Sequence, residues 1–266
     1  MSECWQVLKQ EKSLLLFPIL SGICCLLVLA SFAVPIFVTS AWHPPGANAA
    51  PVQQIVYYGT IFAFYFSNYF VVIFFNAALV ACAAIRMGGG TPTLGDGLRA
   101  AAMRLPMIFG WALVSATVGL ILRAIEERSG KVGQIVAGLL GTAWTMASFL
   151  VVPALVIDNK GPFAALQEST ALLKKTWGEQ LVSNFSFGMI FFLLSVPALA
   201  VIFAGFYFGG VTVGLICAGV AAVYLIVLSL IHTALQAIFQ TALYLYVRDG
   251  QVPEGFRAEV LNGAMN

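Results

Sequence analysis

The sequence contains very few charged residues. Its 266 residues include 13 Lys or Arg and 11 Asp or Glu, which is 9% of the chain, while 61% of the residues are hydrophobic. An ordinary soluble domain needs a polar surface, which so few charges cannot supply. The mean hydropathy of +0.95 therefore excludes such a domain and predicts a chain embedded in a lipid bilayer.

Histidine and cysteine are also scarce. The chain has two histidines, and its five cysteines lie in or beside apolar stretches without the paired spacing of a metal site or a disulfide framework. We expect the cysteines to be small core residues, and we expect neither a metal nor a cofactor. The net charge of +2 and the lack of a basic run indicate no nucleic-acid partner.

The charged residues leave long uncharged runs between them. No Asp, Glu, Lys or Arg occurs from Ser13 to Ile85 or from Gln180 to Val247, and each run is long enough for two membrane spans of about 20 residues. The shorter runs Leu105–Leu122 and Val132–Ile157 add one span each. The sequence thus predicts an all-α, polytopic integral membrane protein with six transmembrane helices.

Turn signals divide the two long runs. The stretch "SAWHPPGANAAPVQQ" interrupts the first run with prolines, and "GFYFGG" from Gly205 to Gly210 interrupts the second. Because Lys and Arg collect on the cytoplasmic side, their distribution predicts the orientation. Three of them, Arg123, Arg128 and Lys131, fall on one side, and the other ten fall on the opposite side. We therefore expect both termini to be cytoplasmic.

An island of charge, "GPFAALQESTALLKKTWGEQL" at Gly161–Leu181, predicts a helix that lies on the membrane surface. At helical spacing its apolar side chains fall on one arc, and its charged side chains lie outside that arc. The apolar arc consists of Phe163, Leu166, Thr170, Leu173 and Trp177. We interpret the segment as an amphipathic elbow that leads into the next span.

Two further elbows precede other spans. In "TLGDGLRAAAMRLP", Thr93 and Asp96 have the spacing of a helix capping box, and "SECWQVLKQEKSLLLFP" begins the chain with a weaker periodicity. Basic residues of the elbows are candidates for contact with anionic lipid headgroups. These candidates are Arg99, Arg104, Lys174 and Lys175.

The chain can be interpreted as one membrane domain, residues 1–266, built from three units. Each unit, at residues 1–87, 91–157 and 161–250, would join an elbow to a helical hairpin, and a short cytoplasmic tail would follow at residues 251–266. The alternative needs no common origin, because cytoplasmic loops between hydrophobic helices tend to be amphipathic and basic.

The last span carries a polar stripe. His232, Gln236 and Gln240 recur every four residues, which places them on one helix face. One hypothesis is that they line a polar path or bind a small polar ligand, together with other amides of the spans. Those amides are Asn68, Asn76 and Asn184. The alternative is that all six only make hydrogen bonds between helices.

Catalysis is not expected from this composition. Enzymes that work within the membrane use carboxylate pairs, a nucleophile with a histidine, or several metal ligands. None of the six predicted spans contains a carboxylate, and His43 lies in a predicted outer loop.

Several segments resemble a family that is known only as a domain of unknown function, a bacterial multi-pass membrane family. They are "WQVLKQEKSLLLFPILSG", "ALQESTALLKKTWG" and "ALYLYVRDGQVPEGFRAEVLNGA", and the resemblance extends from Trp5 to Ala264. It implies a protein of the bacterial inner membrane, and it implies no catalytic residues.

Three functions are compatible with these features. The first is a non-enzymatic scaffold or accessory subunit that packs against other integral membrane proteins or against itself, because small residues suited to close helix packing are frequent. The second is a small permease or channel for a neutral or weakly basic solute that passes His232, Gln236 and Gln240. The third is a protein that binds membrane lipids at its elbows.

Overall fold

The computed structural model describes residues 2–39, 50–128, 130–175, 180–250 and 252–256, and in these ranges the secondary structure is helical, with no strand. This confirms the predicted all-α membrane fold. The helices are α1 (Ser2–Gln10), the 3-10 helix η1 (Lys12–Leu15), α2 (Leu16–Thr39), α3 (Pro51–Met87), α4 (Leu94–Met103), α5 (Leu105–Arg128), α6 (Gly130–Ala147), α7 (Val151–Ile157), α8 (Pro162–Lys175) and α9 (Gln180–Asp249).

Five helical segments among the described residues are long and apolar enough to cross a membrane, where the sequence predicts six spans. The segments are Lys12–Val34, Pro51–Met87, Leu105–Glu127, Gly130–Ile157 and Gly188–Asp249. The last of them contains two predicted spans, because α9 runs through a kink at Gly210, where φ is 68° and ψ is −169°. The exact number of spans stays a prediction.

Helix α9 folds back on itself at this kink. The hydroxyl of Tyr224 donates a hydrogen bond of 2.9 Å to the carbonyl of Leu194, 30 residues earlier, and the backbone at Gly205 approaches the side chain of Cys217. In both pairs the two residues lie at nearly equal distances along the chain before and after Gly210, as expected for two antiparallel arms. The positive φ at the turn is a conformation that glycine adopts without strain. The predicted break at "GFYFGG" is thus confirmed.

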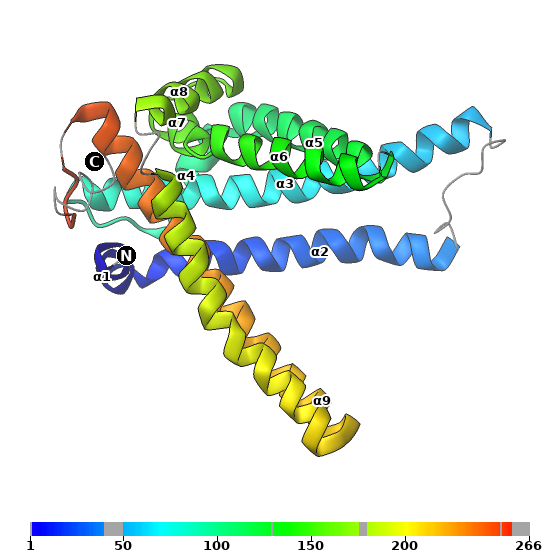
Figure 1. The fold of residues 1–266 in the computed structure, drawn as a ribbon. Helices are drawn as coiled ribbons and strands as arrows, with labels where there is room; N and C mark the ends of the chain where they lie inside the picture. Colours follow the sequence, from blue (N-terminus) through cyan, green and yellow to red (C-terminus); the bar gives the residue numbers. More distant parts are fainter. Residues whose placement is uncertain (1, 40–49, 129, 176–179, 251, 257–266) are drawn as a thin grey trace.

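The buried core lies at one end of the molecule, which we call the base. Helices α1, α4, α7 and α8, together with the C-terminal end of α9, gather at this end (Figure 1). The buried side chains come mainly from the second half of α3, from α7 and from the last turns of α9, and they include Ala77–Ala83, Leu150–Val156 and Ala234–Tyr244. The ends of the long helices therefore pack as in a soluble protein.

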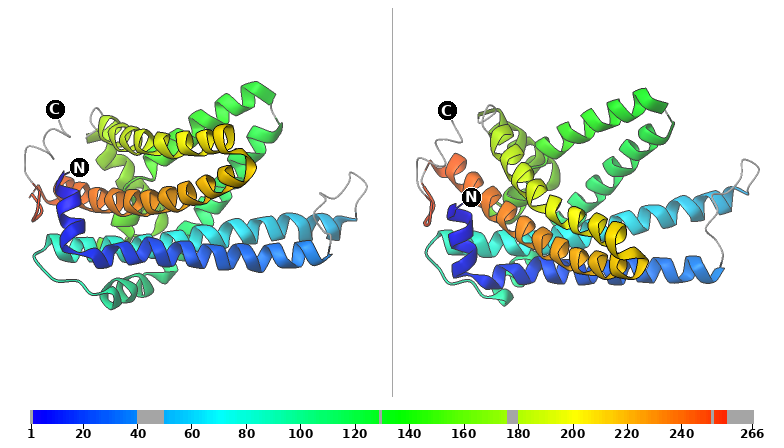
Figure 2. Two further views of the ribbon diagram at one scale, coloured as in Figure 1. Left: turned by 90° about the horizontal axis from the view of Figure 1, so that it is seen from below. Right: turned by 60° about the horizontal axis from the view of Figure 1, so that its bottom comes forward.

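Away from the base the helices are arranged in pairs, of which the α5–α6 pair still contacts α3 through a hydrogen bond from Arg123 to the Tyr65 hydroxyl. Helices α2 and α3 run side by side, α5 and α6 form a second pair, and the two arms of α9 form a third that diverges from the others (Figures 1 and 2). In α3, 50% of the most apolar window is buried, whereas in α9 the share is 11%. The rest of the chain thus leaves most of this apolar window of α9 uncovered. Whether the three pairs descend from a repeated unit stays a prediction.

The start of α4 follows the predicted capping box. The Thr93 hydroxyl accepts a hydrogen bond from the Asp96 amide, and the Asp96 carboxylate accepts one from the Thr93 amide. Hydrogen bonds from Thr93 lower the pKa of the Asp96 carboxyl below its ordinary value. Four residues into the helix, a Cβ at Gly97 would lie 2.6 Å from the Cys82 sulfur, so that α4 can rest on α3 only with glycine here.

The predicted span Val132–Ile157 is not one continuous helix. It divides at residues 148–150 into α6 and α7, because the ring of Pro153 excludes an α-helical turn around the carbonyl of Phe149. The buried hydroxyl of Ser169, on α8, accepts a hydrogen bond of 3.0 Å from the amide of Leu150 that the break exposes. Proline and serine together thus allow α7 to turn into the base.

Helix α8 begins at Pro162, as the elbow interpretation requires, and it lies at the base. Its buried face consists of Ala165, Ser169 and Leu172, which neighbours the predicted apolar arc. Phe163 of that arc is 70% exposed, and Trp177 lies outside the described residues. The helix therefore packs on the protein with one face and leaves Phe163 free to contact the membrane.

Candidate functional site

The polar stripe of α9 runs from the projecting arm into the base. His232 is partly exposed, and its ring meets the ring of Phe191, on the other arm, edge-on at a centroid distance of 4.5 Å. Gln236 is partly buried, and Gln240 is buried at 9% exposure. The predicted stripe is therefore present, and its burial increases toward the core.

The serine and threonine hydroxyl groups near the stripe form hydrogen bonds within α9. Ser229 donates to the carbonyl of Ile226 at 2.8 Å, Thr233 donates to that of Ser229 at 2.9 Å, and Thr241 donates to that of Ala237 at 2.7 Å. These three hydroxyl groups therefore donate within α9 and not to a neighbouring helix.

The amides of the other spans differ in their surroundings. Asn68 donates to the carbonyl of Phe64 in its own helix at 2.9 Å. The side-chain oxygen of Asn76 is buried, and within the described ranges it accepts no hydrogen bond. The side chain of Asn184 lies outside the described residues. A polar path through these six residues stays a prediction.

The candidate headgroup contacts differ in their surroundings. Arg104 reaches across the base and donates a hydrogen bond of 3.4 Å to the carbonyl of Val156, in the last turn of α7. A cation at that position also compensates the helix dipole, so Arg104 has a structural role. Arg99 and Lys174 are exposed, and the side chain of Lys175 is not among those described. Headgroup contact stays a prediction for all four.

Sequence patterns did not reveal a cluster of charged and phenolic groups at the base, which we call the clasp. The carboxylate of Asp158 accepts hydrogen bonds of 2.5 Å from both the Tyr244 hydroxyl and the Arg248 guanidinium. Lys160 lies 3.8 Å from Asp158 and also pairs with Glu168. The clasp therefore joins the loop after α7 to α8 and to the end of α9.

Local structure positions these groups. Asp158 is the C-cap residue of α7, and Asn159 follows it with a φ of 55°, a left-handed conformation that asparagine tolerates. Tyr244 and Arg248 lie one helical turn apart, so that they approach Asp158 from the same side. With Asp249, which also contacts Arg248, three carboxylates face two cations in and beside the clasp. The only sequence signal was that Asp158 and Arg248 each follow an apolar run directly.

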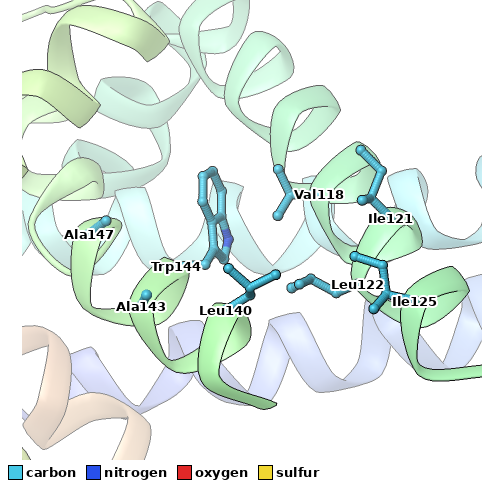
Figure 3. A pocket seen from close by; sticks show the side chains of 8 residues that line it. All are labelled: Val118, Ile121, Leu122, Ile125, Leu140, Ala143, Trp144 and Ala147. Atoms are coloured by element: carbon cyan, nitrogen blue, oxygen red, sulfur yellow. The ribbon is translucent and has the colours of Figure 1, made fainter. Parts of the chain in front are cut away.

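Two pockets lie on the α5–α6 pair. The first has a volume of about 400 Å³, and its apolar lining consists of Val118, Ile121, Leu122, Ile125, Leu140, Ala143, Trp144 and Ala147 (Figure 3). The second is larger, about 710 Å³, and combines polar and apolar surface in about equal parts. Its lining, shared with α3, consists of Tyr65, Tyr69, Gly119, Leu122, Arg123, Glu126, Glu127, Gly130 and Gln134. Neither pocket includes a residue of the stripe.

Comparison with known proteins gives one match. No curated protein and no solved structure matches the chain. A family model described as "Family of unknown function (DUF6159)" matches residues 55–255, which is most of the chain and includes the clasp, both pockets and the stripe. The protein therefore belongs to this family of unknown function, in agreement with the resemblance drawn from its sequence.

Proposed function

We propose that the protein is a non-enzymatic scaffold or accessory subunit of a membrane complex, and that the α9 hairpin is the part that contacts another integral membrane protein. The observation that carries this proposal is the projection of α9 from the base (Figure 1). Only 11% of its most apolar window is buried, the smallest share among the five candidate spans. A hairpin that the rest of the chain does not surround has two long faces free for a partner.

Glycines on these faces support the proposal. At Gly205 and Gly214 a Cβ would come within 3 Å of the opposite arm, so these two glycines serve the packing of the hairpin itself. At Gly188 and Gly219 a Cβ would meet nothing within 4 Å. In membranes, small residues allow the close approach of helix backbones. The outward-facing pair is thus available for a helix of a partner protein.

The base gives the hairpin a fixed support. The stem of α9, Ala234–Tyr244, is embedded in the core, and the clasp binds its end through Asp158. Helix α1 is joined to the end of α3 by a hydrogen bond of 2.8 Å between Arg86 and Gln10. A rigid base with projecting arms suits a protein that holds partners in place.

The permease hypothesis has less support. A solute path would need polar groups turned toward a common space, whereas the hydroxyl groups beside the stripe bond to their own helix. Gln240 continues the stripe into the packed core of the base. We therefore keep the permease as the alternative that transport measurements would have to establish.

We also propose that the protein lies in a bacterial inner membrane with the base on the cytoplasmic side. The basic residues support this orientation, because those of α1, α3, α4, α8 and the end of α9 gather at the base. Arg123 and Lys131 lie at the other end of the α5–α6 pair. An accessibility assay with single cysteines tests the proposal. We expect an impermeant maleimide to label K131C in intact cells, and K9C only after the membrane is opened.

Site-specific photo-crosslinking tests the scaffold proposal. A photoreactive amino acid at Val220, which is 64% exposed on the α9 hairpin, should form an adduct with the same membrane protein, or with a second copy of this chain, in repeated preparations. Leu139 on α6 is the matched control, because it is apolar and 68% exposed but lies outside the proposed contact surface. We expect it to react with lipid.

The outcome separates the hypotheses. Lipid adducts alone at Val220, at the level found for Leu139, would contradict a partner on α9. Solute uptake into vesicles that contain the purified protein alone, and its loss in His232→Ala, would instead support the permease.

A further inference from the structure

The polar pocket between α3 and the α5–α6 pair contains groups of opposite charge. Arg123 pairs with Glu127 at 2.7 Å, donates a hydrogen bond to the Tyr65 hydroxyl and lies over the Tyr65 ring, 5.8 Å from its centroid. Glu126 lines the same pocket and, within the described ranges, forms no ion pair. The pocket therefore contains the Arg123 donors and, about one helical turn further along α5, a carboxylate that forms no ion pair among the described residues.

The position of the pocket along the helices corresponds to a membrane surface. Tyr65 precedes Met87 by 22 residues, which is about 33 Å of helix, and Arg123 follows Leu105 by 18 residues, which is about 27 Å. The hydrocarbon core of a bilayer is about 30 Å thick. If the base marks one membrane surface, the pocket thus lies at the level of the lipid headgroups on the other.

The apolar groove of Figure 3 adjoins the polar pocket, because Leu122 lines both. On α6 the groove extends toward the base, past Leu140 to Ala147, whereas the polar pocket reaches only Gln134. Ala143 and Ala147 leave space beside Trp144, which points into the gap between the two helices (Figure 3). Polar lining at the headgroup level is thus continuous with apolar lining in the membrane interior.

A polar pocket that continues into an apolar groove matches one class of molecule. Arg123 and a phenol suit a phosphate, which accepts charge-assisted hydrogen bonds. Glu126 suits a cation, because its carboxylate can accept charge-assisted hydrogen bonds from an ammonium group. An anionic lipid would leave Glu126 beside a like charge. We propose that the pocket and groove together bind one zwitterionic phospholipid with a primary ammonium, such as phosphatidylethanolamine, with one acyl chain along Leu122 in the groove.

This lipid site is independent of the proposed contact on α9, because it lies on a different helical pair. It also differs from the predicted headgroup contacts of the elbows, since those lie at the base. Lipid binding and partner binding can therefore fail separately.

Native mass spectrometry of the full-length protein tests the lipid site. Protein purified in mild detergent is titrated with phosphatidylethanolamine, phosphatidylcholine or phosphatidylglycerol of equal chain length. We expect phosphatidylethanolamine to bind about tenfold more tightly than either of the others, since a charge-assisted hydrogen bond corresponds to about that factor. Equal affinities for all three lipids would overturn the proposal.

Variants of the headgroup pocket assign the contacts. Glu126→Gln keeps the shape of the side chain and leaves the Arg123–Glu127 pair intact, so it should remove the preference over phosphatidylcholine. Arg123→Gln should weaken both zwitterionic lipids about tenfold. Lys131→Gln is the matched control, because it removes a charge at the start of α6, close to the end of α5 but outside the pocket. It should leave the affinities for all three lipids unchanged. An unchanged preference in Glu126→Gln would contradict the ammonium contact, even if Arg123→Gln does not fold.

A final pair of measurements separates a lipid from a free polar molecule. Ala143→Phe fills the groove and should reduce phosphatidylethanolamine binding several-fold, whereas Leu139→Phe adds bulk on an exposed part of α6 outside the groove and should not. Glycerophosphoethanolamine, which lacks acyl chains, should bind at least a hundredfold more weakly than the lipid. If it binds equally well, or if Ala143→Phe has no effect, the ligand is not a lipid.

Discussion

The Asp158 carboxylate of the clasp provides the sharpest test of how α9 is attached to the base. In Asp158→Ala the Tyr244 hydroxyl loses its acceptor in a fully buried position, and an unpaired buried polar group costs about 1–3 kcal/mol. The pair with Arg248 is partly exposed, at 20% and 30% for the two side chains, and such a pair contributes about 1 kcal/mol. We expect the free energy of unfolding to fall by about 2–4 kcal/mol.

The measurement is thermal unfolding in detergent, followed by the fluorescence of the five tryptophans. For a chain of this size the loss corresponds to a decrease in Tm of roughly 5–10 °C. All variants must be heated at the same rate, because unfolding of membrane proteins in detergent is often irreversible and the midpoint then depends on the rate. Asp158→Asn keeps an acceptor for Tyr244 and should lose about half as much.

Asp249→Asn is the control for this experiment. The Asp249 carboxylate also contacts Arg248, at 2.6 Å. However, the Asp249 side chain is 42% exposed, and Asp249 follows Arg248 directly in α9, so this contact joins no second helix. We expect a change in Tm of less than about 2 °C. Equal decreases in Tm for Asp158→Ala and Asp249→Asn would refute the reasoning, because only the Asp158 carboxylate joins the end of α7 to α9.

Three further predictions concern the elbows. Gly97→Ala should destabilise the protein by several °C in Tm, because its Cβ meets a sulfur at 2.6 Å, whereas Gly95→Ala, with only a hydroxyl at 3.7 Å, should be tolerated. Thr93→Ala should cost about 1 kcal/mol, and Thr93→Ser should restore most of it in the same assay. Burial raises the pKa of the Cys4 thiol from 9.0 to about 11, so that maleimide should label it slowly at pH 8 until the protein unfolds. Because the unfolded thiol ionises from about pH 9, stability should fall between pH 9 and 11, and Cys4→Ala should reduce this slope.

Local patterns in the sequence predict several features of the fold. The uncharged runs predict the apolar helices, because a bilayer tolerates few charges at any position of a span. The capping box at Thr93 and Asp96 and the turn at Gly210 follow from the chemistry of single residues, and both are present. Such features depend on the nearest neighbours in the chain.

Features that depend on distant contacts were not predicted. Hydropathy does not register the break before α7, since all residues around Pro153 are apolar, although the proline itself is a signal against a straight helix. In α8 the periodicity emphasises large apolar residues such as Phe163, while the buried face consists of Ala165, Ser169 and Leu172. Close packing selects small residues, which a hydrophobicity scale hardly distinguishes from polar ones. The clasp joins residues about 90 positions apart, and no local pattern encodes that distance.

The attachment of α9 explains how a projecting hairpin can bind a partner specifically. Association is weakened when a flexible part has to be ordered at the interface, and prior fixation removes much of that cost. The arms contact one another across Gly210 at one end, and the clasp and the buried stem fix the second arm at the other. The orientation of the outward glycines therefore depends on Asp158, although this residue lies at the opposite end of the helix. Loss of the clasp should weaken partner contact at Val220 and leave lipid binding at the α5–α6 pair unchanged, because that pair is held by its own packing.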